Sequence, residues 1–133
     1  MDYVTDTTFL IDIWRERRKP SVATAFARDH ENSVVGLPWV VKGEFLRGAA
    51  LAGQSEAAVD AFLGAFIVVW PNESTLRRYA ALYVDLKRVN SLLGPNDLWI
   101  AACALELELP LLTRNAAEFE RVPRLAVLDY SGT

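Results

Sequence analysis

Short, nearly continuous apolar runs alternate with longer segments of helical periodicity along this chain. The runs fall at residues 3–5, 33–37, 67–70, 111–113 and 126–128, and the helical segments at 7–17, 20–30, 39–52, 55–66, 73–93 and from 96 or 97 to 107. Strands that alternate with helices indicate a parallel sheet with right-handed crossovers. Strands that are apolar throughout indicate a sheet covered on both faces. The pattern therefore predicts an α/β fold, a three-layer α/β/α sandwich with a short parallel sheet.

The bulk composition fits a folded globular protein. The chain has 133 residues, of which 52% are hydrophobic and 23% charged, so we expect a single domain over residues 1–133. Cys103 is the one cysteine, which permits neither an internal disulfide nor a cysteine-based zinc site. The apolar runs are too short to cross a bilayer, and no signal-peptide pattern is present. We expect a cytoplasmic protein with no membrane partner.

Three acids occupy helical positions where a hydrophobic residue is the ordinary choice. Asp6, Glu44 and Asp97 are each spaced three, four or seven residues from apolar side chains, so each lies on or at the head of an apolar stripe. A buried carboxylate is costly unless charge or hydrogen bonding compensates it. Three such acids in one place would repel each other, and a divalent cation is the simplest group that would hold them together.

Each of these acids also has an ordinary structural interpretation. Asp6 opens an Asp-Thr-Thr sequence that is a good helix N-cap, and Asp97, preceded by Asn96, has the same ambiguity. Glu44 lies in mid-helix and cannot be a cap. Its main alternative is a buried salt bridge to Arg47.

The segment that follows the fourth predicted strand adds further oxygen ligands. Asn115 and Glu118 would form a fourth wall of the site, although Asn115 is also a common turn residue and Glu118 could cap a helix or face water. An all-oxygen cluster suits Mg²⁺ or Mn²⁺ rather than zinc. Such ions activate water for phosphodiester cleavage.

The remaining charged and aromatic residues are expected to have ordinary roles. Asp12 and Asp60 should be solvated, His30 should lie on the surface, and the four tryptophans should anchor the core or a dimer surface. A net charge of −3 argues against nucleic-acid binding by bulk charge. Two interpretations of the basic residues remain open, solvated helix faces or an arginine rim around an acidic centre. These basic residues are Arg15, Arg17, Arg18, Lys19, Arg47, Arg77, Arg78, Lys87, Arg88 and Arg114.

With these residues in place, the chain resembles the PIN-domain ribonucleases, specifically the VapC-type toxins of toxin–antitoxin pairs. The resemblance spans nearly the whole chain. It is carried, in this order and spacing, by residues 6–12, 44–49, 94–102, 112–115 and 118–119.

The resemblance implies a metal-dependent endoribonuclease that acts on RNA. It implies that Asp6 and Asp97 bind Mg²⁺ or Mn²⁺ and that Glu44 completes the centre. The fourth position, often aspartate in that family, is Asn115 here, so Glu118 becomes a candidate for the missing charge. The resemblance further implies a homodimer and a cognate antitoxin whose tail fills the active-site groove.

Two rival functions are weighed against this one. A haloacid-type phosphatase also places an aspartate after its first strand, but it needs a second acid where this chain has Thr8. A receiver domain needs paired acids and a late lysine that are missing here. The second rival is a PIN-like module that binds RNA or protein with little or no catalysis, which Asn115 at the fourth position makes credible.

Overall fold

The computed structural model describes residues 1–16 and 22–131, and these form a five-stranded sheet whose neighbouring strands are all parallel. The strand order is β3-β2-β1-β4-β5. The strands are β1 (Tyr3–Thr5), β2 (Val35–Pro38), β3 (Ile67–Val69), β4 (Leu111–Thr113) and β5 (Val127–Asp129). The predicted parallel sheet is confirmed, and each strand falls within two residues of its predicted bounds.

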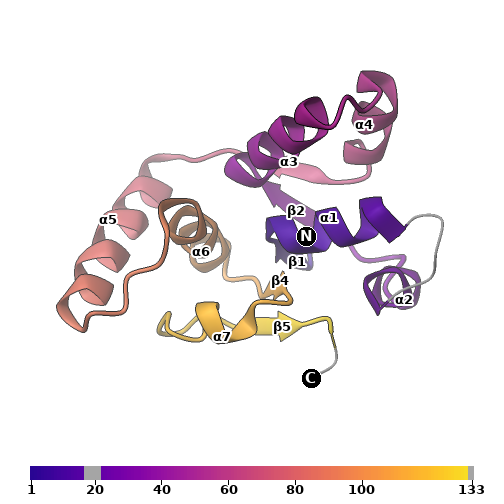
Figure 1. Cartoon of the computed structure of the whole chain (residues 1–133). Coiled ribbons are helices and arrows are strands. Elements are labelled where there is room, and N and C mark those ends of the chain that lie inside the picture. The colour runs from indigo at the N-terminus through magenta and orange to yellow at the C-terminus, as the bar shows by residue number, and fades with distance from the viewer. Residues whose placement is uncertain (17–21, 132–133) are drawn as a thin grey trace.

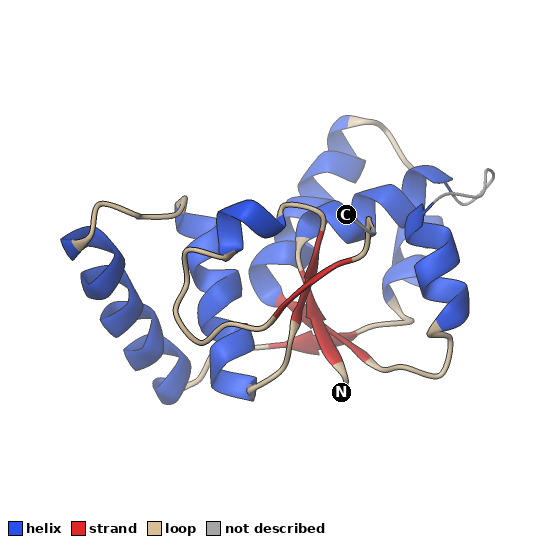
Figure 2. Cartoon of the chain, turned by 90° about the horizontal axis from the view of Figure 1, so that it is seen from below, coloured by secondary structure: helices blue, strands red, loops and turns tan. Residues whose placement is uncertain are grey.

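Helices cover both faces of the sheet. They are α1 (Thr7–Glu16), α2 (Val22–Asp29), α3 (Trp39–Leu51), α4 (Glu56–Leu63), α5 (Glu73–Arg88), α6 (Pro95–Leu107) and α7 (Ala116–Phe119). In Figure 1, α5 and α6 lie on one side of the strands and α1 and α2 on the other. Figure 2, turned by 90°, again shows helices on both sides of the strands. The predicted three-layer α/β/α arrangement is therefore confirmed.

The central strands supply the middle of the core. Val4, Leu37 and Leu111 are fully buried, as are Leu10 on α1 and Ala101 on α6. Each fully buried leucine stabilises the fold by about 2 kcal/mol relative to an exposed one. The burial of these strands on both faces explains why their sequences read as continuous apolar runs.

The tryptophans pack as aromatic clusters in three of four cases. Trp14 meets Phe45 edge-on at a centroid distance of 5.8 Å. Trp99 stacks on Tyr79 at 3.6 Å and meets Trp39 at 5.3 Å. Trp70, directly after β3, is 67% exposed. The expectation of a core anchor is confirmed for Trp14, which packs against the hydrophobic core. Trp39 and Trp99 are half-buried, and Trp70 is a surface residue of this chain.

Three helix ends differ from the sequence-based expectation, and the first is α4, which ends at Leu63 rather than at residue 66. Helix α5 ends at Arg88 rather than at residue 93, because Asn90 adopts a left-handed conformation with φ of 56°. The Asn90 N–H donates to the Lys87 carbonyl and the Ser91 N–H to the Leu86 carbonyl, which is a Schellman ending.

Helix α6 begins one or two residues earlier than predicted. Its N-cap is Gly94 and Pro95 occupies the first position, where a fixed φ and a missing N–H carry no cost. The expectation that Asn96 or Asp97 caps this helix was wrong. Asp97 therefore lies inside the first turn, and its carboxylate is not consumed by capping.

The order of the strands sets a topological switch point between β1 and β4. The chain leaves β1 toward β2 on one side and returns much later as β4 on the other, so the connections after β1 and β4 diverge. Ligands of open α/β sheets bind at such a switch point, beyond the carboxyl ends of the strands. Asp6 directly follows β1, and Arg114 and Asn115 directly follow β4.

Candidate active site

Asp6 is both a helix cap and a buried acid. It is 2% exposed, and its Oδ1 accepts hydrogen bonds from the Thr8 hydroxyl at 2.6 Å and from the Phe9 N–H at 3.3 Å. Its Oδ2 accepts a 2.5 Å hydrogen bond from the Thr113 hydroxyl. Burial raises the pKa of Asp6 above its ordinary value, although all three hydrogen bonds oppose that rise. The two interpretations of Asp6 are thus compatible rather than exclusive.

Glu44 is half-buried on α3 and is held by the start of α1. The Thr7 hydroxyl donates a 2.9 Å hydrogen bond to Glu44 Oε1. Because Thr7 follows Asp6 in the chain, this bond brings α3 to the end of β1. The alternative of a salt bridge to Arg47 was wrong, since no such pair forms among the described residues and Arg47 is exposed.

The negative charges of the other acids act on Asp97. It is half-buried in the first turn of α6, and its pKa is raised to about 6, chiefly by burial and then by repulsion from Asp6, Glu44 and Glu118. Such repulsion falls off with distance, so Asp97 lies within the electric field of all three carboxylates. Segments that are far apart in the sequence thus contribute to one acidic cluster.

Asn115 and Glu118 lie on the connection that leaves β4. Asn115 is exposed, and its N–H donates a 2.9 Å hydrogen bond to the Thr113 hydroxyl oxygen, the same hydroxyl that donates to Asp6. Glu118 is half-buried in α7, with its carboxylate 3.8 Å from Arg121 Nη2. The short helix α7 itself was not predicted from the sequence.

Thr113 is the positioning residue that sequence reasoning missed. The strand register pairs Thr5 with Leu112, which sets Thr113 opposite Asp6. A threonine at the end of an apolar strand carried no signal of its own. The signal was the combination of parallel pairing and register, which only the fold supplies.

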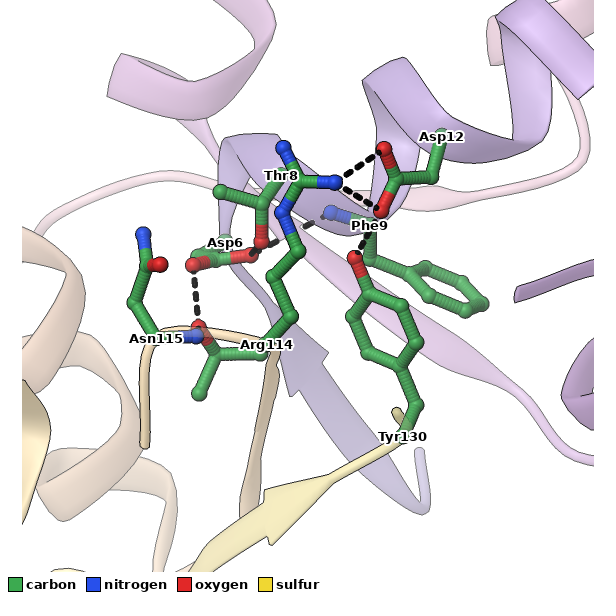
Figure 3. A network of polar contacts seen from close by, with 8 residues as sticks. Asp6, Thr8, Phe9, Asp12, Arg114, Asn115 and Tyr130 are labelled. Atoms are coloured by element: carbon green, nitrogen blue, oxygen red, sulfur yellow. Dashed lines mark hydrogen bonds and ion pairs between the residues drawn. The ribbon is translucent and has the colours of Figure 1, made fainter. Parts of the chain in front are cut away.

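Asp12 was wrongly expected to be solvated. It is 8% exposed and accepts hydrogen bonds from Arg114 Nη1, at 2.8 and 3.0 Å, and from the Tyr130 hydroxyl (Figure 3). Tyr130 also packs against Phe9, with ring centroids 4.9 Å apart, and thereby covers this side of α1. Asp12 is buried because residues more than 100 positions away pack over it, which helical periodicity cannot reveal.

The other expectations for charged residues had mixed outcomes. Asp60 is exposed, as predicted. His30 is half-buried rather than on the open surface, because its ring stacks on Phe26 at 3.9 Å. The basic residues of α5 are exposed, which confirms a solvated helix face there; they are Arg77, Arg78, Lys87 and Arg88. Three members of the early basic cluster, Arg17, Arg18 and Lys19, lie outside the described residues.

The acidic cluster fits a hard cation in composition but is not a ready-made cage. Within residues 1–16 and 22–131, no three His, Cys, Asp or Glu side chains are grouped closely enough to hold a metal ion. The charged groups that act on Asp97 are nevertheless carboxylates, whose oxygens Mg²⁺ and Mn²⁺ prefer, and Mg²⁺ keeps part of its water shell. The repulsion that raises the pKa of Asp97 is the energy that such an ion would relieve.

Comparison with known proteins agrees with this geometry. The PIN domain family matches residues 3–125. The chain belongs to the PIN domain family. "Ribonuclease VapC1" of Haemophilus influenzae (strain R2866) is 30% identical over 134 residues, which cover 98% of this chain and 99% of that protein. The resemblance to VapC-type PIN domains is confirmed.

Solved structures resemble the PIN domain over the same length. VapBC-1 from nontypeable Haemophilus influenzae has a TM-score of 0.81 at 28% identity and covers 98% of this chain and 99% of its own. A toxin-antitoxin complex from Klebsiella pneumoniae has a TM-score of 0.76 at 25% identity and covers 97% and 98%. No helix in the described part of this PIN domain is long and apolar enough to cross a bilayer.

Proposed function

We propose that this PIN domain is a divalent-metal-dependent endoribonuclease, the toxin of a toxin–antitoxin pair. The observation that supports the proposal is the electrostatic coupling at the start of α6, where burial and repulsion from Asp6, Glu44 and Glu118 raise the pKa of Asp97 to about 6. The full-length match to a protein named a ribonuclease supports RNA as the substrate. We treat residues 1–133 as a single nuclease domain.

The proposed roles follow from how each side chain is held. Asp6 and Asp97 bind Mg²⁺, with Mn²⁺ as a possible replacement, and Glu44 completes the centre directly or through water. When bound, the ion polarises the scissile phosphate and lowers the pKa of a water molecule. Thr113, Thr8 and the Phe9 N–H fix the orientation of Asp6, and Thr7 fixes that of Glu44.

The fourth wall is assigned to Asn115 and Glu118 together. Asn115 cannot supply charge. Its N–H donates to the Thr113 hydroxyl, which in turn donates to Asp6, so Thr113 links the two residues. Glu118 contributes repulsion at Asp97 and therefore supplies the negative charge that the amide lacks.

We also propose the partners that this activity requires. A cognate antitoxin silences the enzyme, a homodimer is the working unit, and both act in the cytoplasm. A hollow of about 310 Å³ opens beside Glu44 and suits an apolar segment of the antitoxin tail, since its lining includes Ile11, Trp14 and Phe45. The toxin-antitoxin complex among the solved structures that resemble this chain supports this assignment.

The direct test is cleavage of structured RNA by the purified full-length chain with Mg²⁺ and with a chelator. Asp6→Asn and Asp97→Asn should abolish cleavage while the circular dichroism spectrum is unchanged. Asp60→Asn is the matched control, since Asp60 is an exposed acid on α4, and it should cleave like the wild type. Equal activity of all three variants, or full activity in the chelator, would refute the site.

A binding module without catalysis is the second candidate. It is favoured by Asn115 at the fourth position and by the lack of a ready-made ligand group among the described residues. Isothermal titration with Mn²⁺ separates the two candidates, because an inactive module should take up little metal. Turnover of a chromogenic phosphomonoester would instead favour the phosphatase rival.

A further inference from the structure

A second polar network lies beside the acidic cluster. Arg114 extends from the end of β4 toward α1, where its Nη1 donates to both oxygens of Asp12 (Figure 3). The side chain of Asp12 is only 11% exposed, whereas that of Arg114 is 48% exposed. One end of this pair is therefore anchored in the protein and the other is open to solvent.

Tyr130 fixes Asp12 from the opposite side. It is 5% exposed and donates its hydroxyl proton to Asp12 Oδ2, while its ring packs on Phe9. Thr8, whose hydroxyl donates to Asp6, opposes the rise that burial causes in the pKa of Tyr130. The network that holds Arg114 thus adjoins the one that orients Asp6.

Fold stability does not explain this arrangement. A half-exposed ion pair contributes about 0–1 kcal/mol to stability because solvent screens it. Burying the Asp12 carboxylate costs more than that unless every hydrogen bond is made. The effect of this ion pair is instead to fix the direction of the Arg114 side chain.

The unused donors of Arg114 suit a phosphate group. A guanidinium carries five N–H donors, and Nη1 supplies the contacts to Asp12. Among interactions of the described residues, Nε and Nη2 of Arg114 make none. Their three N–H groups match the fork geometry with which arginine binds phosphate oxygens.

A fixed cation is also needed on electrostatic grounds. The chain carries a net charge of −3, and the acidic cluster repels a polyanion at the point where it must bind. Arg114 follows Thr113, which orients Asp6, and precedes Asn115, so its backbone borders that cluster while its charge is held at Asp12 on α1.

We propose that Asp12 and Tyr130 are positioning residues that hold Arg114 as a clamp for the RNA phosphate backbone beside the acidic cluster. The inference rests on the proposed function, because it names how the same site grips its substrate. Phosphate contacts of this kind set the register of a nucleic acid without reading its bases.

The decisive variant is Asp12→Asn, because a pure charge effect and the loss of the Arg114 anchor predict opposite changes in RNA binding. Removing one negative charge near a polyanion should strengthen RNA binding if only charge matters. Loss of the anchor should raise KM several-fold with kcat unchanged, since a clamp acts equally on bound substrate and transition state. Tyr130→Phe should shift KM in the same direction, and Asp60→Asn should leave both constants unchanged.

Arg114→Gln completes a double-mutant cycle. It should raise KM more than Asp12→Asn does and reduce the slope of log affinity against log salt by about 1. In the Arg114→Gln background, Asp12→Asn should have no further effect on KM. Additive effects, or a lower KM for Asp12→Asn, would overturn the clamp.

Fluorescence anisotropy with the same RNA distinguishes failure of the clamp from failure of the proposed nuclease function. If the wild type cleaves RNA and Asp12→Asn binds it with wild-type affinity, the clamp is refuted and the nuclease stands. If the wild type does not cleave, the proposed function fails. Weaker binding by Asp12→Asn would then still support the clamp, and equal or tighter binding would refute it.

Discussion

The Thr113 hydroxyl at the end of β4 donates a 2.5 Å hydrogen bond to Asp6 Oδ2 at the end of β1, although 107 positions separate the two residues. The bond exists because β1 and β4 are neighbouring parallel strands in a register that sets these residues opposite each other. It leaves Asp6 with hydrogen bonds on both carboxylate oxygens, so the orientation of this acid is fixed by protein groups alone.

Thr113→Val should lower RNA cleavage by about 10- to 100-fold, the usual effect of removing a group that orients a metal ligand. The substitution removes the donor to Asp6 and the acceptor for the Asn115 N–H, and it keeps the side-chain volume. Thr113→Ser retains the hydroxyl and is the control that should stay near wild-type activity. Wild-type cleavage by Thr113→Val would show that this bond has no role in the site.

Asp97→Asn should inactivate the enzyme and yet stabilise the metal-free protein near neutral pH. The pKa of Asp97 rises from 3.8 to about 6, so between these values the folded state binds more protons than the unfolded state. The free energy of unfolding therefore falls as pH rises through this window. After allowance for solvent screening of a half-exposed carboxylate, the gain above pH 6 should be about 1 kcal/mol.

Thermal unfolding in chelator at pH 7.5 and pH 4.5 measures this effect. Asp97→Asn should have a higher Tm than the wild type at pH 7.5, and the difference should shrink at pH 4.5, where Asp97 is protonated. Asp60→Asn should show no difference at either pH. A lower Tm for Asp97→Asn at pH 7.5 would contradict the acidic cluster.

Asn115→Asp should increase affinity for Mn²⁺ and lower the Tm of the metal-free protein. Both effects have one cause, an added negative charge at a residue that Thr113 links to Asp6 through two hydrogen bonds. Isothermal titration and thermal unfolding measure them. Asn32→Asp, at an exposed turn, is the matched control. Unchanged Mn²⁺ affinity in Asn115→Asp would remove Asn115 from the fourth wall.

The sequence predicted most of the fold, and it singled out the acids whose charges act on Asp97. Continuous apolar runs identified every strand because burial on both faces leaves little room for polar residues. Glu44 stood out because a mid-helix acid on an apolar stripe has few structural uses. The environment of Asp12 could not be predicted, since its partners Arg114 and Tyr130 reach it only through tertiary packing.

Helix ends were the least predictable part of the fold. Helix α5 was predicted to run to residue 93, directly before Gly94, and glycine is the commonest left-handed residue, but Asn90 takes that conformation first. Gly94 instead caps α6. Both residue types tolerate the left-handed region, so local sequence alone does not decide between them.

Asn90→Ala should destabilise the chain by about 1 kcal/mol, because alanine pays the full steric cost of a left-handed conformation. Asn90→Gly should be neutral or slightly stabilising, since glycine adopts that conformation freely. Urea unfolding followed by circular dichroism measures both. Equal stability of the two variants would mean that α5 does not end in this conformation.

The position of β1 at the centre of the sheet has a consequence for biosynthesis. Asp6 leaves the ribosome 107 residues before Thr113, and Asn115 and Glu118 follow later still. A nascent chain therefore lacks these side chains of its catalytic centre until the segment with β4 and α7 has been made. We expect copies that stop before this segment to be harmless to the message that encodes them, and the inhibitor to be required only once this segment has folded beside β1.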